Sequence, residues 1–199
     1  MNQILLPIII PLAAAALVLL TSDRARYLKE LMAIAASGAA LAVSVLIAGQ
    51  ALYGASPEFS SAWAGYGISF SLKADNLSSF LLLGTAFFSF LVAIYSFSFD
   101  RKGNAKWFYF NLLVTQAFSA GAALADNLVA LLFFWEGLLV FLYVFIALSG
   151  SGQASRNTAR KAFLISAVTD LCLLAGVCIT GYVAGTFNMS AIAADKLTL

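Results

Sequence analysis

The sequence is dominated by long apolar runs, each about the length that a helix needs to cross a membrane. Roughly 20 apolar residues span the hydrocarbon layer of a bilayer, which is about 30 Å thick. Runs of this length recur throughout the chain, at residues 4–20, 31–53, 77–97, 107–125, 128–148 and 162–183. They are too long and too continuous for the short alternating strands of a membrane barrel. We therefore expect an all-α fold, a polytopic transmembrane bundle of about six helices.

The composition agrees with a chain whose main partner is the lipid bilayer. Of 199 residues, 62% are hydrophobic and only 10% are charged, whereas a soluble domain is about half apolar and a quarter charged. The net charge of +2 comes from basic residues spread over short connections, unlike the concentrated positive surface of a nucleic-acid-binding protein. No linker or internal repeat divides the sequence, so we expect residues 1–199 to form a single membrane domain.

The residue types also limit the cofactors that the chain could hold. It contains no His, which excludes a haem held by two histidines, and its two Cys residues form no cluster for an iron–sulfur centre. We expect neither a cofactor nor a metal site. Any electron transfer would then take place on a partner protein.

The basic residues lie almost entirely on alternate connections between the runs. Nine of the eleven fall in the first, third and fifth connections: Arg24, Arg26, Lys29, Arg101, Lys102, Lys106, Arg156, Arg160 and Lys161. Because basic loops stay on the cytoplasmic side, we expect the N-terminus and the 54–76 connection outside. Six alternating crossings satisfy this orientation without an exception.

The long external connection carries a strand pattern. Residues 68–73 alternate between apolar and polar side chains, which predicts a short strand that pairs with residues 59–63 in a surface hairpin. Asp75 and Asp126 each stand just before an apolar run. We expect each of them to cap the N-terminus of the helix that follows.

Two acidic residues lie deep inside apolar runs. Glu136 is eight residues into the run 128–148, about 12 Å from its outer end at about 1.5 Å per residue. Asp170 is eight residues into the run 162–183, which crosses in the opposite direction. We therefore expect both carboxylates at similar depth near the middle of the membrane. Each costs about 2.5 to 3.5 kcal/mol to insert there, so each needs a polar partner, a hydrated cavity or a function.

A role in proton transfer is the interpretation that we favour for both acids. Burial disfavours the charged form of a carboxyl group, and a buried acid can therefore take up and release protons near neutral pH. The alternative is that each acid only forms hydrogen bonds between helices. Lys161, beside Arg160 at the expected start of the sixth helix, either helps to set the topology or takes part in proton entry. Hydroxyl side chains in the third and fourth runs favour helix packing over a water path.

Several motifs of the chain resemble those of a known family. They are Ala74-Asp75-Asn76-Leu77-Ser78, Ala125-Asp126-Asn127-Leu128, Trp135-Glu136-Gly137, and Arg160-Lys161-Ala162-Phe163 followed by Asp170. In this combination the chain resembles the antiporter-like subunits of respiratory complex I, of Mrp sodium/proton antiporters, and of energy-converting hydrogenases and formate hydrogenlyases. The resemblance covers the N-terminal part of those subunits, helices one to six.

The resemblance implies roles for three residues. Glu136 corresponds to the family's key glutamate on the fifth helix, Asp170 to the acidic residue on the sixth, and Lys161 to the basic residue at the start of the sixth. Complex I relatives often carry an arginine three residues before the acid, where this chain has Ala167, and this departure favours the hydrogenase-like branch.

The resemblance also implies a cellular role. The chain would be an integral protein of the bacterial inner membrane that moves H⁺ or Na⁺. It would act as a non-redox subunit of an NADH-quinone oxidoreductase or of a membrane-bound hydrogenase.

Members of this family continue beyond the stretch that the chain resembles. They carry a broken seventh helix with a lysine that pairs with the glutamate, then an eighth helix and an inverted repeat with a second lysine. Because half-channels lie between such repeats, we expect further membrane helices, from a longer polypeptide or from partner subunits, to complete an ion path. Two other functions stay open: a shortened scaffold subunit without its own ion path, and an unrelated small transporter.

Overall fold

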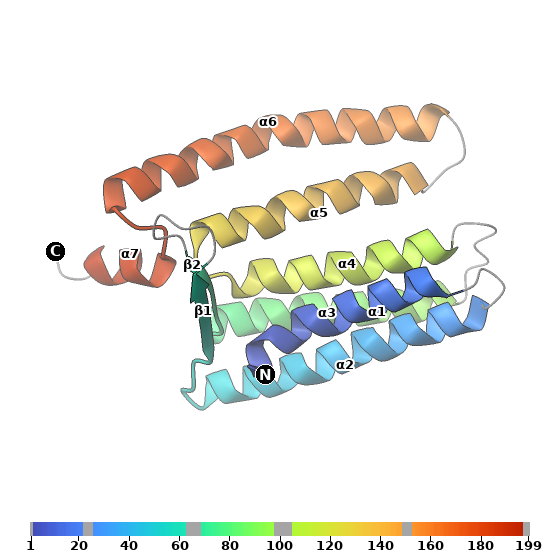
Figure 1. The fold of residues 1–199 in the computed structure, drawn as a ribbon, viewed down its shortest axis with the longest axis horizontal. Coiled ribbons are helices and arrows are strands. Elements are labelled where there is room, and N and C mark those ends of the chain that lie inside the picture. The colour runs from blue at the N-terminus through green and yellow to red at the C-terminus, as the bar shows by residue number, and fades with distance from the viewer. Residues whose placement is uncertain (1, 22–25, 63–68, 98–104, 149–152, 197–199) are drawn as a thin grey trace.

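The computed structural model describes residues 2–21, 26–62, 69–97, 105–148 and 153–196. Its long helices lie side by side in alternating directions, with a two-stranded hairpin and a short last helix at one end (Figure 1). The helices are α1 (Leu6–Leu20, after a 3-10 turn at Gln3–Leu5), α2 (Arg26–Leu52), α3 (Asn76–Phe97), α4 (Ala105–Leu124), α5 (Leu128–Leu148), α6 (Gln153–Ala184) and α7 (Met189–Lys196); the strands are β1 (Glu58–Ala62) and β2 (Ser69–Lys73). The expected helical membrane bundle with a short hairpin is confirmed.

Five helical stretches within the described residues are long and apolar enough to cross a membrane: Gln3–Leu20, Tyr27–Leu52, Asn76–Phe97, Leu128–Leu148 and Arg156–Ala184. The run 107–125 forms α4, which is not among the five. This helix contacts α1, α2, α3 and α5, and it buries the polar side chains of Asn111 and Gln116. Because other helices surround α4, it does not need a wide apolar surface toward lipid.

The first four helices share a core built largely from small side chains. Ala15, Ala33 and Ala93 are almost fully buried where these helices meet. Small residues allow helix backbones to approach closely in a membrane, where dispersion contacts replace the hydrophobic effect as the driving force. Gly38 on α2 illustrates the approach, since a Cβ atom there would lie 3.2 Å from the ring of Phe90 on α3.

The hairpin closes one end of the bundle. Strand β1 pairs antiparallel with β2, with Phe59 opposite Leu72. Leu72 is fully buried, and the ring of Phe70 lies 5.8 Å from that of Phe134 on α5. The predicted pairing is confirmed for residues 59–62 and 69–73, whereas residues 63 and 68 lie outside the described residues.

Only one of the two aspartates expected to cap helices does so. The Ser78 amide donates to Asp75 Oδ1 at 2.7 Å, which caps α3. At α5 the prediction is wrong: Asn127 Oδ1 accepts from the Val129 amide at 2.9 Å and is the cap. Asp126 instead accepts a hydrogen bond from the Ser190 hydroxyl of α7 at 2.7 Å. Its carboxylate therefore binds α7 and not, as the local sequence predicted, the N-terminus of α5.

Helix α6 is longer than the apolar run that predicted it. It begins at Gln153 rather than near residue 162, so the prediction that Lys161 stands at the helix start is wrong. The residues before Lys161 include good helix formers such as Gln, Ala and Arg, which extend the helix beyond its apolar part. Lys161 therefore lies in the third turn, with an exposed side chain.

Most basic residues that the structure describes lie at one end of the bundle. Lys29 and Lys106 belong to the first turns of α2 and α4, and Arg156, Arg160 and Lys161 to the first three turns of α6; these helix ends lie at one end of the bundle (Figure 1). The hairpin and α7 lie at the opposite end. Among the described residues, only Lys73 and Lys196 are basic and belong to that opposite end.

Candidate functional site

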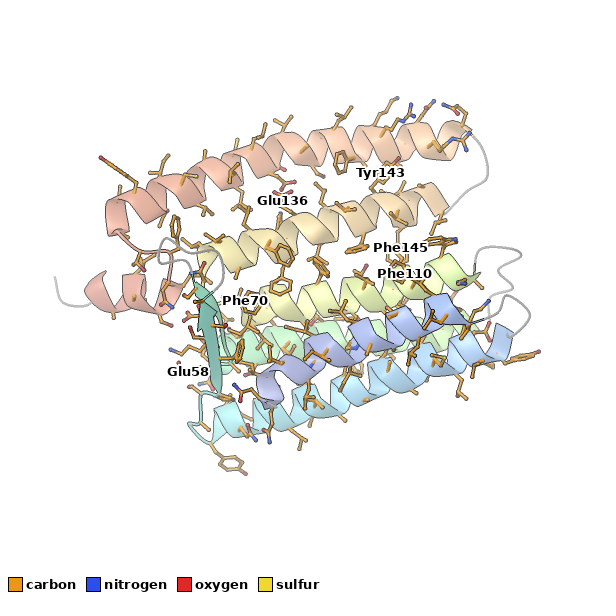
Figure 2. All side chains as sticks on the ribbon, viewed as in Figure 1. Glu58, Phe70, Phe110, Glu136, Tyr143 and Phe145 are labelled. Atoms are coloured by element: carbon orange, nitrogen blue, oxygen red, sulfur yellow. The ribbon has the colours of Figure 1, made fainter. Side chains whose placement is uncertain are left out.

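The two acids expected near the middle of the membrane lie on neighbouring helices. Figure 2 shows the Glu136 side chain between α5 and α6. Beside it in the sequence, Trp135 Nε1 donates a hydrogen bond to Asp170 Oδ1 on α6 at 3.1 Å. Glu136 is one residue along α5 from the group that contacts Asp170. The two acids therefore lie at a similar depth in the bundle.

Asp170 is the more enclosed of the two acids. Its side chain is 8% exposed, while that of Glu136 is partly buried. Oδ1 accepts the indole N–H, but Oδ2 is buried without a hydrogen bond from any of the described residues. A buried carboxylate oxygen without a donor is costly. Asp170 is thus half satisfied, and its second oxygen can still take a donor or a proton.

The packing of α5 against α4 sets the direction of both functional side chains. Phe134 packs where Gly121 of α4 has no side chain, and Phe118 of α4 packs against Gly137 in the same way. A Cβ atom at either glycine would overlap the opposing ring. Since successive helix residues are rotated by about 100°, a helix that turns positions 134 and 137 toward α4 turns 135 and 136 away from it. The intervening Trp135 and Glu136 therefore face α6.

A cavity of ≈ 380 Å³ lies beside Asp170, between α4, α5 and α6. Its polar lining comes from side chains of all three helices, and leucines and Phe145 line the rest. The polar residues are Thr115, Trp135, Ser166, Thr169 and Asp170. Water occupies about 30 Å³ per molecule in the liquid, so this space has room for several waters.

The two threonine hydroxyl groups in this cavity are acceptors toward it. Thr115 Oγ1 donates to the Asn111 carbonyl at 2.7 Å, and Thr169 Oγ1 donates to the Ser166 carbonyl at 2.6 Å. Each hydroxyl hydrogen is therefore used within its own helix, which leaves the oxygen lone pairs for the cavity. The same local bonds support the helix-packing interpretation of these side chains.

The structure does not bring Lys161 to the carboxylates. Nine residues separate it from Asp170 on the same helix, which corresponds to about 13 Å along the axis. The groove nearest to this end of α6 is lined by Tyr143, Arg160, Phe163 and Leu164. A part in proton entry therefore stays a prediction for Lys161.

Sequence reasoning missed the importance of three polar side chains. Trp135 entered only as part of a motif, although its indole is the link between α5 and Asp170. Asn111 Nδ2 donates to the Phe141 carbonyl at 3.0 Å and joins α4 to α5. Gln116 Oε1 accepts from the Ser37 hydroxyl at 2.9 Å inside the first four helices. An amide inside an apolar run was the available signal for the last two.

Within the described parts of the chain, no three His, Cys, Asp or Glu side chains come together as a metal site. The acids of α5 and α6 stand as a pair, with an indole and hydroxyl groups around them. Such an arrangement suits proton exchange better than the binding of a divalent cation, which takes more oxygen ligands.

Comparisons with known proteins relate this chain to membrane proteins of one family. Residues 125–197 match the family model described as NADH:quinone oxidoreductase/Mrp antiporter, TM. That match contains both Glu136 and Asp170. The chain is also 31% identical to a Na(+)/H(+) antiporter subunit of Bacillus subtilis over 192 residues, covering 95% of this chain and 38% of that protein.

Solved structures share the fold. A chain of the Mrp complex from a Dietzia species superposes with a TM-score of 0.82 at 22% identity, over 97% of this chain and 38% of the other. A chain of respiratory complex I from Thermus thermophilus gives a TM-score of 0.80 at 20% identity, over 96% of this chain and 39% of the other. This chain thus spans less than two fifths of the length of each of these proteins.

Proposed function

Because this chain is related in sequence and fold to the antiporter-like membrane subunits of complex I and the Mrp antiporters, we propose that it moves protons or sodium ions through a larger membrane assembly. Glu136, partly buried at the contact between α5 and α6, is the protonation site in this proposal, and Asp170 is its neighbour on the path. The observation that supports it most directly is the hydrogen bond from Trp135, the residue before Glu136, to Asp170 across the contact between α5 and α6, within the family-matched segment.

The chemistry of the site follows from charge and burial. An ammonium group brought near Glu136 by a further helix favours the carboxylate, and its withdrawal favours uptake of a proton. Return of the positive charge then expels the proton. A peripheral redox module of the host complex, such as an NADH-quinone oxidoreductase or a membrane-bound hydrogenase, would supply the energy for this movement.

The test is the variant Glu136→Gln in the full-length protein within its native complex. Glutamine keeps the shape of the side chain but carries no exchangeable acid, so ion transport should fall to the background of vesicles without the complex. Transport is measured with a pH-sensitive dye and with ²²Na⁺ in inverted membrane vesicles. The amount of assembled complex on a native gel should not change.

Glu58→Gln is the matched control, because Glu58 is an exposed glutamate on β1 outside the helices. This variant should transport ions at the rate of the unchanged protein. Normal transport by Glu136→Gln would contradict the proposal and would favour the alternative, a scaffold subunit without its own ion path.

We also propose the orientation of the chain in an inner membrane. The basic first turns of α2, α4 and α6 lie at one end of the bundle (Figure 1), and basic segments stay in the cytoplasm. The hairpin and the N-terminus then lie outside. A cysteine introduced at the exposed Ser60 should react with an impermeant thiol reagent added to intact spheroplasts. Labelling that requires broken membranes would reverse the orientation.

A further inference from the structure

The indole of Trp135 is the one hydrogen-bond donor that the described residues offer to the Asp170 carboxyl group. We propose that Trp135 is a positioning residue: by occupying Oδ1, it leaves Oδ2 as the oxygen of Asp170 that carries a proton, and this proton is shared with Glu136. The inference rests on the proposed function and assigns a distinct task to each of three residues.

The geometry of the hydrogen bond supports the first step. The distance of 3.1 Å from Nε1 to Oδ1 lies within the usual range for an N–H···O bond. An indole nitrogen only donates, so Oδ1 must be an acceptor in both states of the acid. The carbonyl oxygen of a neutral carboxyl group is its stronger acceptor, so the indole favours the form of neutral Asp170 in which Oδ1 is the carbonyl oxygen and Oδ2 is the hydroxyl oxygen.

The surroundings of Oδ2 support the second step. This oxygen is buried and accepts no hydrogen bond from the described residues. Once protonated, it becomes a donor that needs an acceptor. Glu136 is the other acid at this contact, since it directly follows Trp135, whose indole bonds Asp170. The threonine oxygens of the cavity beside Asp170 offer acceptors for water that would bridge to it.

The transfer balances with one proton and no other reactant. The O–H bond at Oδ2 of Asp170 breaks as an O–H bond forms on a carboxylate oxygen of Glu136. The negative charge passes from Glu136 to Asp170, where the indole N–H stabilises it. Trp135 and Glu136 are consecutive residues of α5, so one helix carries both the group that orders Asp170 and the group that exchanges its proton.

The position of Trp135 is fixed by the contact between α4 and α5. Phe134 and Gly137, on either side of the pair, interlock with Gly121 and Phe118. Rotation of α5 would break both interlocking contacts. The indole is therefore held toward α6 although half of its surface is exposed.

The first experiment is Trp135→Phe in the full-length protein within its complex. Phenylalanine keeps an aromatic ring but has no N–H group, so ion transport should fall about tenfold, as expected for the loss of one charge-assisted hydrogen bond. Trp107→Phe is the matched control, because Trp107 is an exposed tryptophan of α4 outside this site. It should leave transport unchanged.

A double variant separates positioning from general disruption. Asp170→Asn keeps an acceptor for the indole but removes the acid. If Trp135 acts through Asp170, adding Trp135→Phe to Asp170→Asn should lower residual transport no further. A second tenfold loss in the double variant would overturn the proposal.

Infrared spectroscopy of the assembled complex detects the hydrogen bond between Trp135 and Asp170 directly, without a transport measurement. The carboxyl C=O band that disappears in Asp170→Asn should move to higher frequency in Trp135→Phe, because Oδ1 has lost its donor. An unshifted band would overturn the proposal. The infrared result does not depend on ion transport, so it can contradict the role of Trp135 even if Glu136→Gln abolishes transport as the proposed function requires.

Discussion

Helices α1 to α4 and helices α5 and α6 are packed in different ways. Each of the first four contacts two or more of the others, and together they bury small side chains such as Ala33 and Ala93 completely. Helix α5 packs on α4, and α6 packs on α5 at the edge of the bundle (Figure 1). Large apolar side chains of α6, such as Leu171 and Ile179, are about 65% exposed.

The first four helices thus provide rigid support, whereas α5 and α6 provide the acids. The first four helices form a compact bundle, and α5 is attached to it through the interlocking contact with α4. The carboxylates lie one helix further out, at the contact between α5 and α6, where fewer neighbours hold the chain. Fewer packing contacts allow local movement at lower cost, which suits a group that must exchange protons and respond to a moving charge. Lipid or further helices would cover the outer face of α6.

The largest effect on stability should come from removing a ring at the contact between the two regions. Phe134→Ala should lower the free energy of unfolding by about 3 to 5 kcal/mol, because Phe134 is 4% exposed and fills the space over Gly121. Leu171→Ala should change it by less than about 0.5 kcal/mol, because lipid solvates that leucine equally well when the helix is separated.

Both variants are measured by reversible unfolding of the full-length protein in mixed micelles. Similar losses at Phe134 and Leu171 would contradict the comparison, since they would show that α6 is packed as firmly as the contact between α4 and α5.

A smaller effect should follow from a single added methyl group. Gly121→Ala should destabilise the fold by about 1 to 3 kcal/mol, because its Cβ overlaps the buried ring of Phe134. Gly176→Ala on α6 should stabilise it by about 0.5 to 1 kcal/mol, since nothing lies within 4 Å of that Cβ and Ala favours the helix. The same unfolding assay measures whether each substitution raises or lowers the free energy of unfolding. A lower value for both variants would contradict the comparison, because it would indicate a close neighbour at Gly176.

Most of the fold could be predicted from the sequence, because each element depends on a local pattern. The apolar run 128–148 coincides with α5, and the alternation over residues 68–73 predicted the second strand of the hairpin. Errors arose where polar residues continue a helix, as before Lys161 on α6. Periodicity of apolar residues does not reveal a helix that extends out of the hydrocarbon.

The site could be predicted only in part. A carboxylate within an apolar run is conspicuous, so Glu136 and Asp170 were both expected from the sequence. Partners of those acids depend on the rotation and depth of neighbouring helices, which no local pattern encodes. For the same reason Asp126 was assigned to α5, whereas α7, more than 60 residues later, takes its carboxylate.

That contact of Asp126 has a mechanical consequence. The Leu128 amide donates to the Phe187 carbonyl, the Met189 amide to the Asp126 carbonyl, and Lys73 Nζ to the Ser190 hydroxyl, all within 3.1 Å. Gly185, with φ of 66°, ends α6 and turns the chain into this cluster. The start of α5 and the end of α6 are thereby joined at the hairpin end of the bundle. The two helices are therefore attached to each other at both ends, by this cluster beside the hairpin and by the chain itself between Leu148 and Gln153 at the basic end, with Glu136 and Asp170 between the two attachments.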